Sequence, residues 1–136
     1  MEYSFNLISP FDGNTSSFNS LFNARNSIFL AGPCPRHDFS DDWRFEAFKI
    51  LDKLGFTGNV ITPSNKNYSK MLTDFGMTKE KSLQTQTSWE RAAMHVASAI
   101  AFWIPRDEQH PARTTNFELG EWYKKPNIFV GWPNTA

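Results

Sequence analysis

The sequence predicts an α/β fold, a parallel β-sheet flanked by helices, and three observations support this prediction. Short apolar runs that stop at glycine or proline alternate along the chain with segments whose apolar residues recur at helical spacing. The chain has 136 residues, a length typical of one domain with a core of its own. No internal repeat or low-complexity tract interrupts the alternation.

The first 26 residues are rich in Asn, Ser and Phe, so we expect residues 1–26 to form an irregular N-terminal arm. Scattered phenylalanines are expected to anchor this arm: Phe5, Phe11, Phe18 and Phe22. Residues 27–136 are expected to form the α/β domain.

Four apolar runs are predicted to be strands, because each is short and a glycine or proline follows it directly. The predicted strands span 27–31, 59–62, 99–104 and 128–130.

The segments between these strands predict three helices, from about 40 to 54, from 87 to 97 and from 117 to about 124. Gly55 is a natural stop for the first of them. The polar stretch 64–86 lacks periodicity and is expected to be a long loop, either a functional lid or a disordered segment.

The composition excludes several classes of protein. Fourteen Lys plus Arg balance fourteen Asp plus Glu, so the chain lacks the basic excess of a protein that binds nucleic-acid polymers. A single cysteine excludes a disulfide framework and a cysteine zinc site, and the histidines lack metal-ligand spacing, so no metal is expected. With neither a signal peptide nor a membrane span visible, the expected location is the cytoplasm.

Aromatic residues are abundant, with 13 Phe, 5 Trp and 3 Tyr, which suits either a dense core or a site that stacks on planar ligands. In parallel sheets, ligands bind at the carboxyl ends of the strands, in the loops that lead to helices. Two loops are predicted at this edge, 32–40 and 106–116.

The first of these loops begins Gly32-Pro33-Cys34-Pro35-Arg36. It lacks the glycines of a dinucleotide-binding fingerprint or a P-loop, and from the residues alone it is typical of a tight turn. Cys34 has no local partner that would activate its thiol.

Two glutamates are candidates for chemistry, and each also has a structural explanation. Glu118 follows Thr115 by three residues, and Glu90 follows Thr87 by three, a spacing that is typical of a helix capping box. Cleavage of a glycosidic bond likewise requires two carboxylates, one at the sugar carbon and one that moves a proton. The spacing leaves both interpretations open.

Several motifs occur in an order and at distances typical of one enzyme family. They are Ile28-Phe29-Leu30-Ala31-Gly32-Pro33, Trp43-Arg44, Trp89-Glu90, Phe102-Trp103-Ile104-Pro105-Arg106 and Thr114-Thr115-Asn116-Phe117-Glu118-Leu119-Gly120. Together they make the chain resemble the nucleoside 2-deoxyribosyltransferase-like family over about residues 27–133. The resemblance is greatest to a branch found in bacteria and their phages.

This resemblance implies a flavodoxin/Rossmann-like fold and cleavage or transfer at the N-glycosidic bond of a (deoxy)nucleoside or nucleoside 5′-monophosphate. It implies that Glu118 is the nucleophile, through a covalent glycosyl-enzyme intermediate, and that Glu90 is the acidic partner. Gly32 and Pro33 would line the pocket for base and sugar. The resemblance implies no cofactor.

Further substrate-binding residues follow from the same resemblance. Cys34, Arg36 and Trp43 would face the ligand. Many members carry an aspartate shortly before the nucleophile, and here Thr115 and Asn116 are its substitutes. Asn116 would then bind a sugar hydroxyl, and Arg113 would favour a 5′-phosphate.

The resemblance also implies a homo-oligomer, because members share active-site residues between subunits. Members usually continue into another helix, whereas this chain has a short C-terminus that ends at Ala136. The N-terminal arm or a second subunit is therefore expected to cover the sheet.

The alternative function is a non-catalytic protein that binds or sequesters a nucleotide on the same fold. A third interpretation is a structural domain in which both glutamates only cap helices.

Overall fold

A computed structural model describes residues 3–9, 21, 25–33, 42–63, 79–104, 119–122, 124–125 and 127–132. Its elements are β1 (Asn6–Ile8), β2 (Ser27–Ala31), α2 (Arg44–Lys53), β3 (Asn59–Ile61), α4 (Lys79–Val96), β4 (Ala99–Trp103) and β5 (Ile128–Gly131). Residues 119–122 are also helical.

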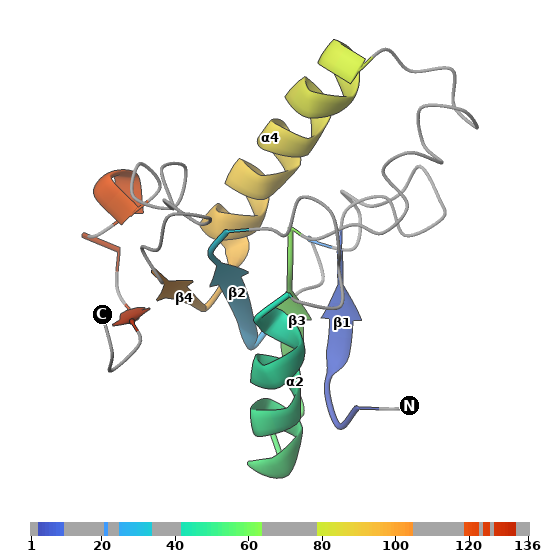
Figure 1. The fold of residues 1–136 in the computed structure, drawn as a ribbon, viewed down its shortest axis with the longest axis vertical. Coiled ribbons are helices and arrows are strands. Elements are labelled where there is room, and N and C mark those ends of the chain that lie inside the picture. Colours follow the sequence, from blue (N-terminus) through green and yellow to red (C-terminus); the bar gives the residue numbers. More distant parts are fainter. Residues whose placement is uncertain are drawn as a thin grey trace.

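The strands form one parallel sheet in the order β1-β3-β2-β4-β5 (Figure 1). The predicted α/β fold with a parallel sheet is therefore confirmed. Strands β2 and β4 lie at the centre of the sheet and read as nearly continuous apolar runs, because a parallel strand covered on both faces needs apolar residues throughout.

Helices cover both faces of the sheet, and alternate residues of each strand point to opposite sides. On one face Leu30 and Val60 pack with Phe48 of α2. On the other face Phe29 and Ile61 share a cluster with residues of α4 and of the helical turn 119–122: Trp89, Ala93, Met94, Leu119 and Trp122.

The direction in which the chain crosses the sheet reverses between β2 and β4. From β2 the chain passes through α2 to β3 on one side, and from β3 it returns through α4 to β4 on the other side of β2. Such a switch point leaves a crevice at the carboxyl ends of the two central strands, where open α/β sheets bind ligands. The topology therefore places the candidate site above β2 and β4.

Two segments differ from the sequence-based expectation. Residues 6–8, within the predicted irregular arm, form the edge strand β1, which pairs with β3. Helix α4 begins at Lys79, so the loop predicted over 64–86 was wrong for its last eight residues. Figure 1 shows this first part of α4 rising beyond the carboxyl ends of the strands. A helix that leaves the sheet needs no apolar stripe, which explains the missing periodicity.

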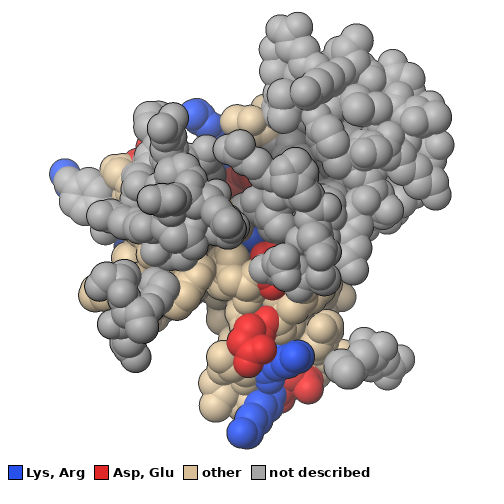
Figure 2. All heavy atoms as spheres, in the orientation of Figure 1, with Lys and Arg blue, Asp and Glu red and all other residues tan. Residues whose placement is uncertain are grey.

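The end of α2 agrees with the prediction at Gly55. Gly55 has φ +77°, its N–H bonds to the carbonyl of Asp52, and the N–H of Phe56 bonds to that of Leu51. This pattern is a Schellman motif, and the left-handed conformation explains the glycine. Figure 2 shows acidic and basic side chains gathered over the outer face of α2, where Lys49 and Glu46 form an exposed pair.

The arm reaches the same end of α2. Ser4 donates through its N–H to Asp52 and through its hydroxyl to the carbonyl of Phe56, and Phe5 is buried beside Phe48. Of the four phenylalanines predicted as anchors, Phe11, Phe18 and Phe22 lie outside the described residues.

The last turn of α4 is closed by Lys125, whose Nζ donates to the carbonyls of Met94, at 2.5 Å, and His95, at 2.9 Å. Burial lowers the pKa of Lys125 from its usual value.

Within the described ranges, no helix is both long and apolar enough to cross a membrane.

Candidate functional site

A turn at the carboxyl end of β2 forms the floor of the candidate site, and a buried arginine holds it in place. Arg44, the first residue of α2, is 1% exposed. Its guanidinium donates to the carbonyls of Leu30 at 3.1 Å, Gly32 at 2.7 Å and Pro33 at 3.2 Å. Arg44 thus fixes the path of the backbone where β2 ends.

The charge of Arg44 is balanced by Asp42, which is also buried. One carboxylate oxygen of Asp42 lies 3.1 Å from Nη1 of Arg44 and accepts the backbone N–H of Arg44 at 3.1 Å. The same carboxylate therefore pairs with the side chain and satisfies an N–H at the start of α2. The fork of the guanidinium lets one residue tie a helix start to a strand end.

Trp43 lies between these two residues and packs directly on the turn. A Cβ at Gly32 would lie 2.8 Å from Cζ2 and Nε1 of the indole, so a glycine is needed for this close approach. The ring centroid of Trp43 is 6.3 Å from that of Trp103, at the end of β4, and 4.8 Å from the Arg44 guanidinium carbon. The carboxyl ends of β2 and β4 therefore carry adjoining indole rings.

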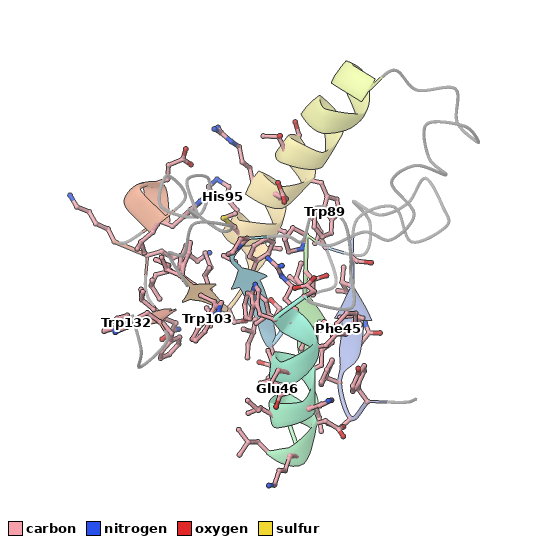
Figure 3. The ribbon with its side chains drawn as sticks, viewed as in Figure 1. Phe45, Glu46, Trp89, His95, Trp103 and Trp132 are labelled. Atoms are coloured by element: carbon pink, nitrogen blue, oxygen red, sulfur yellow. The ribbon has the colours of Figure 1, made fainter. Side chains whose placement is uncertain are left out.

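Glu90, the predicted acidic partner, is partly buried on α4. Its neighbour Trp89 shares a buried cluster with Ile8, Ala31 and Ile61, the last residues of β1, β2 and β3. Figure 3 shows Trp89 where α4 passes this edge of the sheet. Glu90 therefore belongs to the part of α4 beside the carboxyl ends of the strands.

The capping-box interpretation of Thr87 and Glu90 was wrong. Thr87 is the ninth residue of α4, well inside the helix, where no free N–H groups await a cap. Glu90 therefore does not cap the start of a helix.

The structure brings Trp43 against Gly32, and Pro33 continues the same turn. That these three residues bind substrate stays a prediction. The other predicted site residues lie outside the described part of the chain: Cys34, Arg36, Arg113, Thr115, Asn116 and Glu118. The helical turn directly after Glu118 is described, and its Leu119 packs against the core cluster beneath α4.

The sequence analysis included Arg44 in a family motif but did not predict that Arg44 and Asp42 form a buried pair that holds the turn. A charged residue at a helix start normally faces water, and the three carbonyls that Arg44 binds belong to another element. The sequence does contain one signal for this pair: Asp42 lies two positions before Arg44, after the loop predicted at the ligand-binding edge of the sheet.

A separate open hollow of about 410 Å³ lies at the opposite edge of the sheet, between Phe56 and Phe129. Its rim includes Ser98 and Asn127, which precede β4 and β5, so it opens at the amino ends of the strands. Parallel sheets bind ligands at the other edge, and this hollow is not part of the candidate site.

Among the residues that the structure describes, no group of three or more His, Cys, Asp or Glu could hold a metal ion.

The sequence model of one family, described as nucleoside 2-deoxyribosyltransferase like, matches residues 25–136. A comparison with curated proteins gives no match.

Proposed function

Since the chain belongs to the nucleoside 2-deoxyribosyltransferase-like family, we propose that it cleaves or transfers the N-glycosidic bond of a (deoxy)nucleoside or a nucleoside 5′-monophosphate. The family match over residues 25–136 is the observation that carries this proposal. The turn held by Arg44 and the two indole rings at the β2/β4 switch point support it, because they form a built surface where such folds bind ligands.

In the proposed reaction, the carboxylate of Glu118 attacks the anomeric carbon of the sugar as the bond from that carbon to the base nitrogen breaks. The electron pair of the broken bond leaves with the base, which takes a proton from an acidic group, and we assign Glu90 to this role. The product is a glycosyl ester of Glu118. Water then hydrolyses the ester, or the nitrogen of a second base attacks the anomeric carbon and completes a transfer.

We assign the floor of the pocket to Gly32 and Pro33, with Trp43 beside them. A flat indole suits contact with a planar base. Cys34 and Arg36 follow in the same loop and are proposed to face the ligand.

The residues before Glu118 are proposed to bind the sugar. Thr115 and Asn116 offer hydrogen-bonding groups for its hydroxyls, and Arg113 offers a charge for a 5′-phosphate.

We also propose that the protein is a homo-oligomer. Phe129, Val130 and Trp132, in and directly after the edge strand β5, are 61%, 41% and 64% exposed. An apolar edge of this kind is a typical surface for pairing with another copy. Small-angle scattering at micromolar concentration is expected to give at least twice the mass of one chain, and a monomeric mass would contradict the proposal.

The catalytic proposal is tested by chromatography of free base. The protein is incubated with deoxynucleosides, ribonucleosides and their 5′-monophosphates, with and without an acceptor base. Glu118→Ala is expected to abolish base release. Glu121→Ala is the matched control, since Glu121 follows Glu118 by three residues, lies in the helical turn 119–122, is exposed and pairs with Arg91 at 3.5 Å; this variant is expected to keep the activity.

Release that persists in Glu118→Ala would contradict the assignment of the nucleophile. Dependence of turnover on the acceptor base would identify a transferase, and turnover without it a hydrolase. Tight binding with no release from any member of the panel would refute catalysis and favour a sequestering protein.

A further inference from the structure

The helical turn 119–122 and the residues just after it are attached to the last turn of α4 at two points. The ring of Trp122 packs at right angles against that of His95, with ring centroids 4.5 Å apart and an interplanar angle of 88° (Figure 3). Three residues later, Lys125 donates through Nζ to the carbonyls of Met94 and His95. The backbone N–H of Lys125 in turn bonds to the carbonyl of Trp122 at 2.9 Å.

Trp122 lies at the centre of this attachment. Its side chain is half-buried against the core cluster beneath α4, and Nζ of Lys125 lies 5.6 Å from its ring centroid. A large ring that is packed against the core, a second ring and a cation has few orientations open to it. Because Glu118 is bonded to Leu119, the first residue of the turn, the way the turn sits on α4 limits where the Glu118 carboxylate can lie.

The proposed reaction depends on that position. Two carboxylates that cleave a glycosidic bond through a covalent intermediate stand only about 5 Å apart. One of the two proposed carboxylates, Glu90, precedes His95 by five residues, and the other, Glu118, precedes Trp122 by four. The ring contact is therefore close along the chain to both, and a misplacement of about 1 Å can slow such a step about a hundredfold.

We propose that Trp122 and His95 are positioning residues, and that their ring contact sets where the nucleophile Glu118 lies relative to α4. This inference rests on the proposed function, which assigns the chemistry to Glu118 and Glu90. Neither ring touches the substrate, and both act through the helical turn 119–122.

The exposed pair of Arg91 and Glu121 also joins the turn to α4, but it does not carry the positioning. Its two charges are 3.5 Å apart, with Arg91 61% exposed, and ion pairs of this kind contribute little. Glu121→Ala is therefore a matched control on the same turn.

A purely structural role for the ring contact makes a different prediction. Its loss would then lower the stability of the protein but leave the rate of the folded protein unchanged. A positioning role predicts a slower attack on the sugar with unchanged binding of the nucleoside, because neither ring belongs to the binding surface.

The test is single-turnover base release, measured well below Tm with the protein in excess over the best nucleoside of the panel. The dependence on protein concentration gives a maximal rate and a half-saturating concentration. The variants are His95→Leu, Trp122→Leu, the double variant and Trp122→Phe. His95 is exposed, so His95→Leu is expected to fold and tests the contact even where Trp122→Leu does not. A second control, Phe48→Leu, loosens the core on the other face of the sheet.

His95→Leu and Trp122→Leu are each expected to lower the maximal rate about tenfold, with the half-saturating concentration within about twofold of its original value. The double variant is expected to lose no more than the larger single loss, because both changes break one contact. Trp122→Phe keeps an aromatic ring against His95 and is expected to recover most of the rate. Both controls are expected to keep it.

An unchanged maximal rate in His95→Leu and Trp122→Leu would overturn the inference. So would an equal loss in Phe48→Leu, a double loss equal to the product of the two single losses, or a change confined to the half-saturating concentration. These outcomes leave the proposed function standing if base release still depends on Glu118. If the unmodified protein releases no base from any member of the panel, the proposed function and this inference are both wrong.

Discussion

Replacement of Arg44 by methionine tests whether the buried ion pair organises the turn at the end of β2. Methionine keeps much of the length of the side chain but removes its charge and its donors. The carbonyls of Leu30, Gly32 and Pro33 each lose a hydrogen bond, and the carboxylate of Asp42 loses the positive charge that faces it at 3.1 Å.

The expected loss of stability follows from the burial of the pair. The side chains of Arg44 and Asp42 are 1% and 4% exposed, and breaking a buried pair by removing one partner costs about 3–5 kcal/mol. The entropy of unfolding is about 2.1 cal/mol/K per residue, so the free energy of unfolding of this 136-residue chain falls by about 0.29 kcal/mol per degree near Tm. We therefore expect Tm to fall by roughly 10–17 °C.

Thermal unfolding followed by circular dichroism measures this shift. The matched control is Arg91→Met, because Arg91 and Glu121 also form an ion pair, at 3.5 Å, but with Arg91 61% exposed. An exposed pair contributes at most about 1 kcal/mol, so the control is expected to shift Tm by no more than about 3 °C.

A fall of less than about 3 °C for Arg44→Met would refute the reasoning, since it would mean that solvent or other donors replace the guanidinium at little cost. The double variant Arg44→Met/Asp42→Asn provides a second check. It is expected to lose less stability than the sum of the two single variants, because the second change removes the charge that the first leaves buried.

Two further perturbations have defined outcomes. Gly32→Ala places a methyl group 2.8 Å from the rigid indole of Trp43 and is expected to lower stability by about 1–3 kcal/mol in denaturant unfolding. Gly120→Ala, where a Cβ meets nothing within 4 Å, is expected to be neutral or stabilising, and equal losses in both would argue against the close approach. Lys125→Met removes the donor from the last turn of α4 and is expected to cost about 1 kcal/mol. Burial lowers the pKa of Lys125, so the unfolded chain binds more protons than the folded protein just below pH 10.5. The free energy of unfolding of the unmodified protein, relative to that of Lys125→Met, should therefore rise with pH through that window. A fall would contradict the direction of the pKa shift.

The central part of the fold was predictable from the sequence because its strands are buried on both faces. Residues 27–31 and 99–103 are apolar runs with sharp stops, and the segments between such runs show helical spacing. Alternation of this kind permits few topologies, and a parallel sheet is the simplest.

The missed elements lack those signals. Strand β1 has three residues, of which Asn6 and Leu7 are exposed, so neither its length nor its pattern distinguishes it from an arm. It is recognisable as a strand only by its pairing with β3, a contact between residues more than 50 positions apart. The first eight residues of α4 are polar except for Leu83 and lie beyond the sheet, where packing imposes no period.

At the site, sequence motifs identified the turn but not what holds it. Gly32 and Trp43 were singled out through the resemblance, and the structure gives a physical reason for both, because the indole packs where a Cβ would lie. The role of Arg44 was missed because its partners are backbone carbonyls, and any sequence supplies these.

The most direct test of the central proposal compares binding and base release in the same two proteins. The unmodified protein and Glu118→Ala are titrated with the best nucleoside of the panel, and the free base is then quantified over time. The proposal predicts similar Kd values and a loss of release of at least about a thousandfold in Glu118→Ala. Base release at the same rate in both proteins would contradict it, because the nucleophile of the proposed reaction would then not be Glu118.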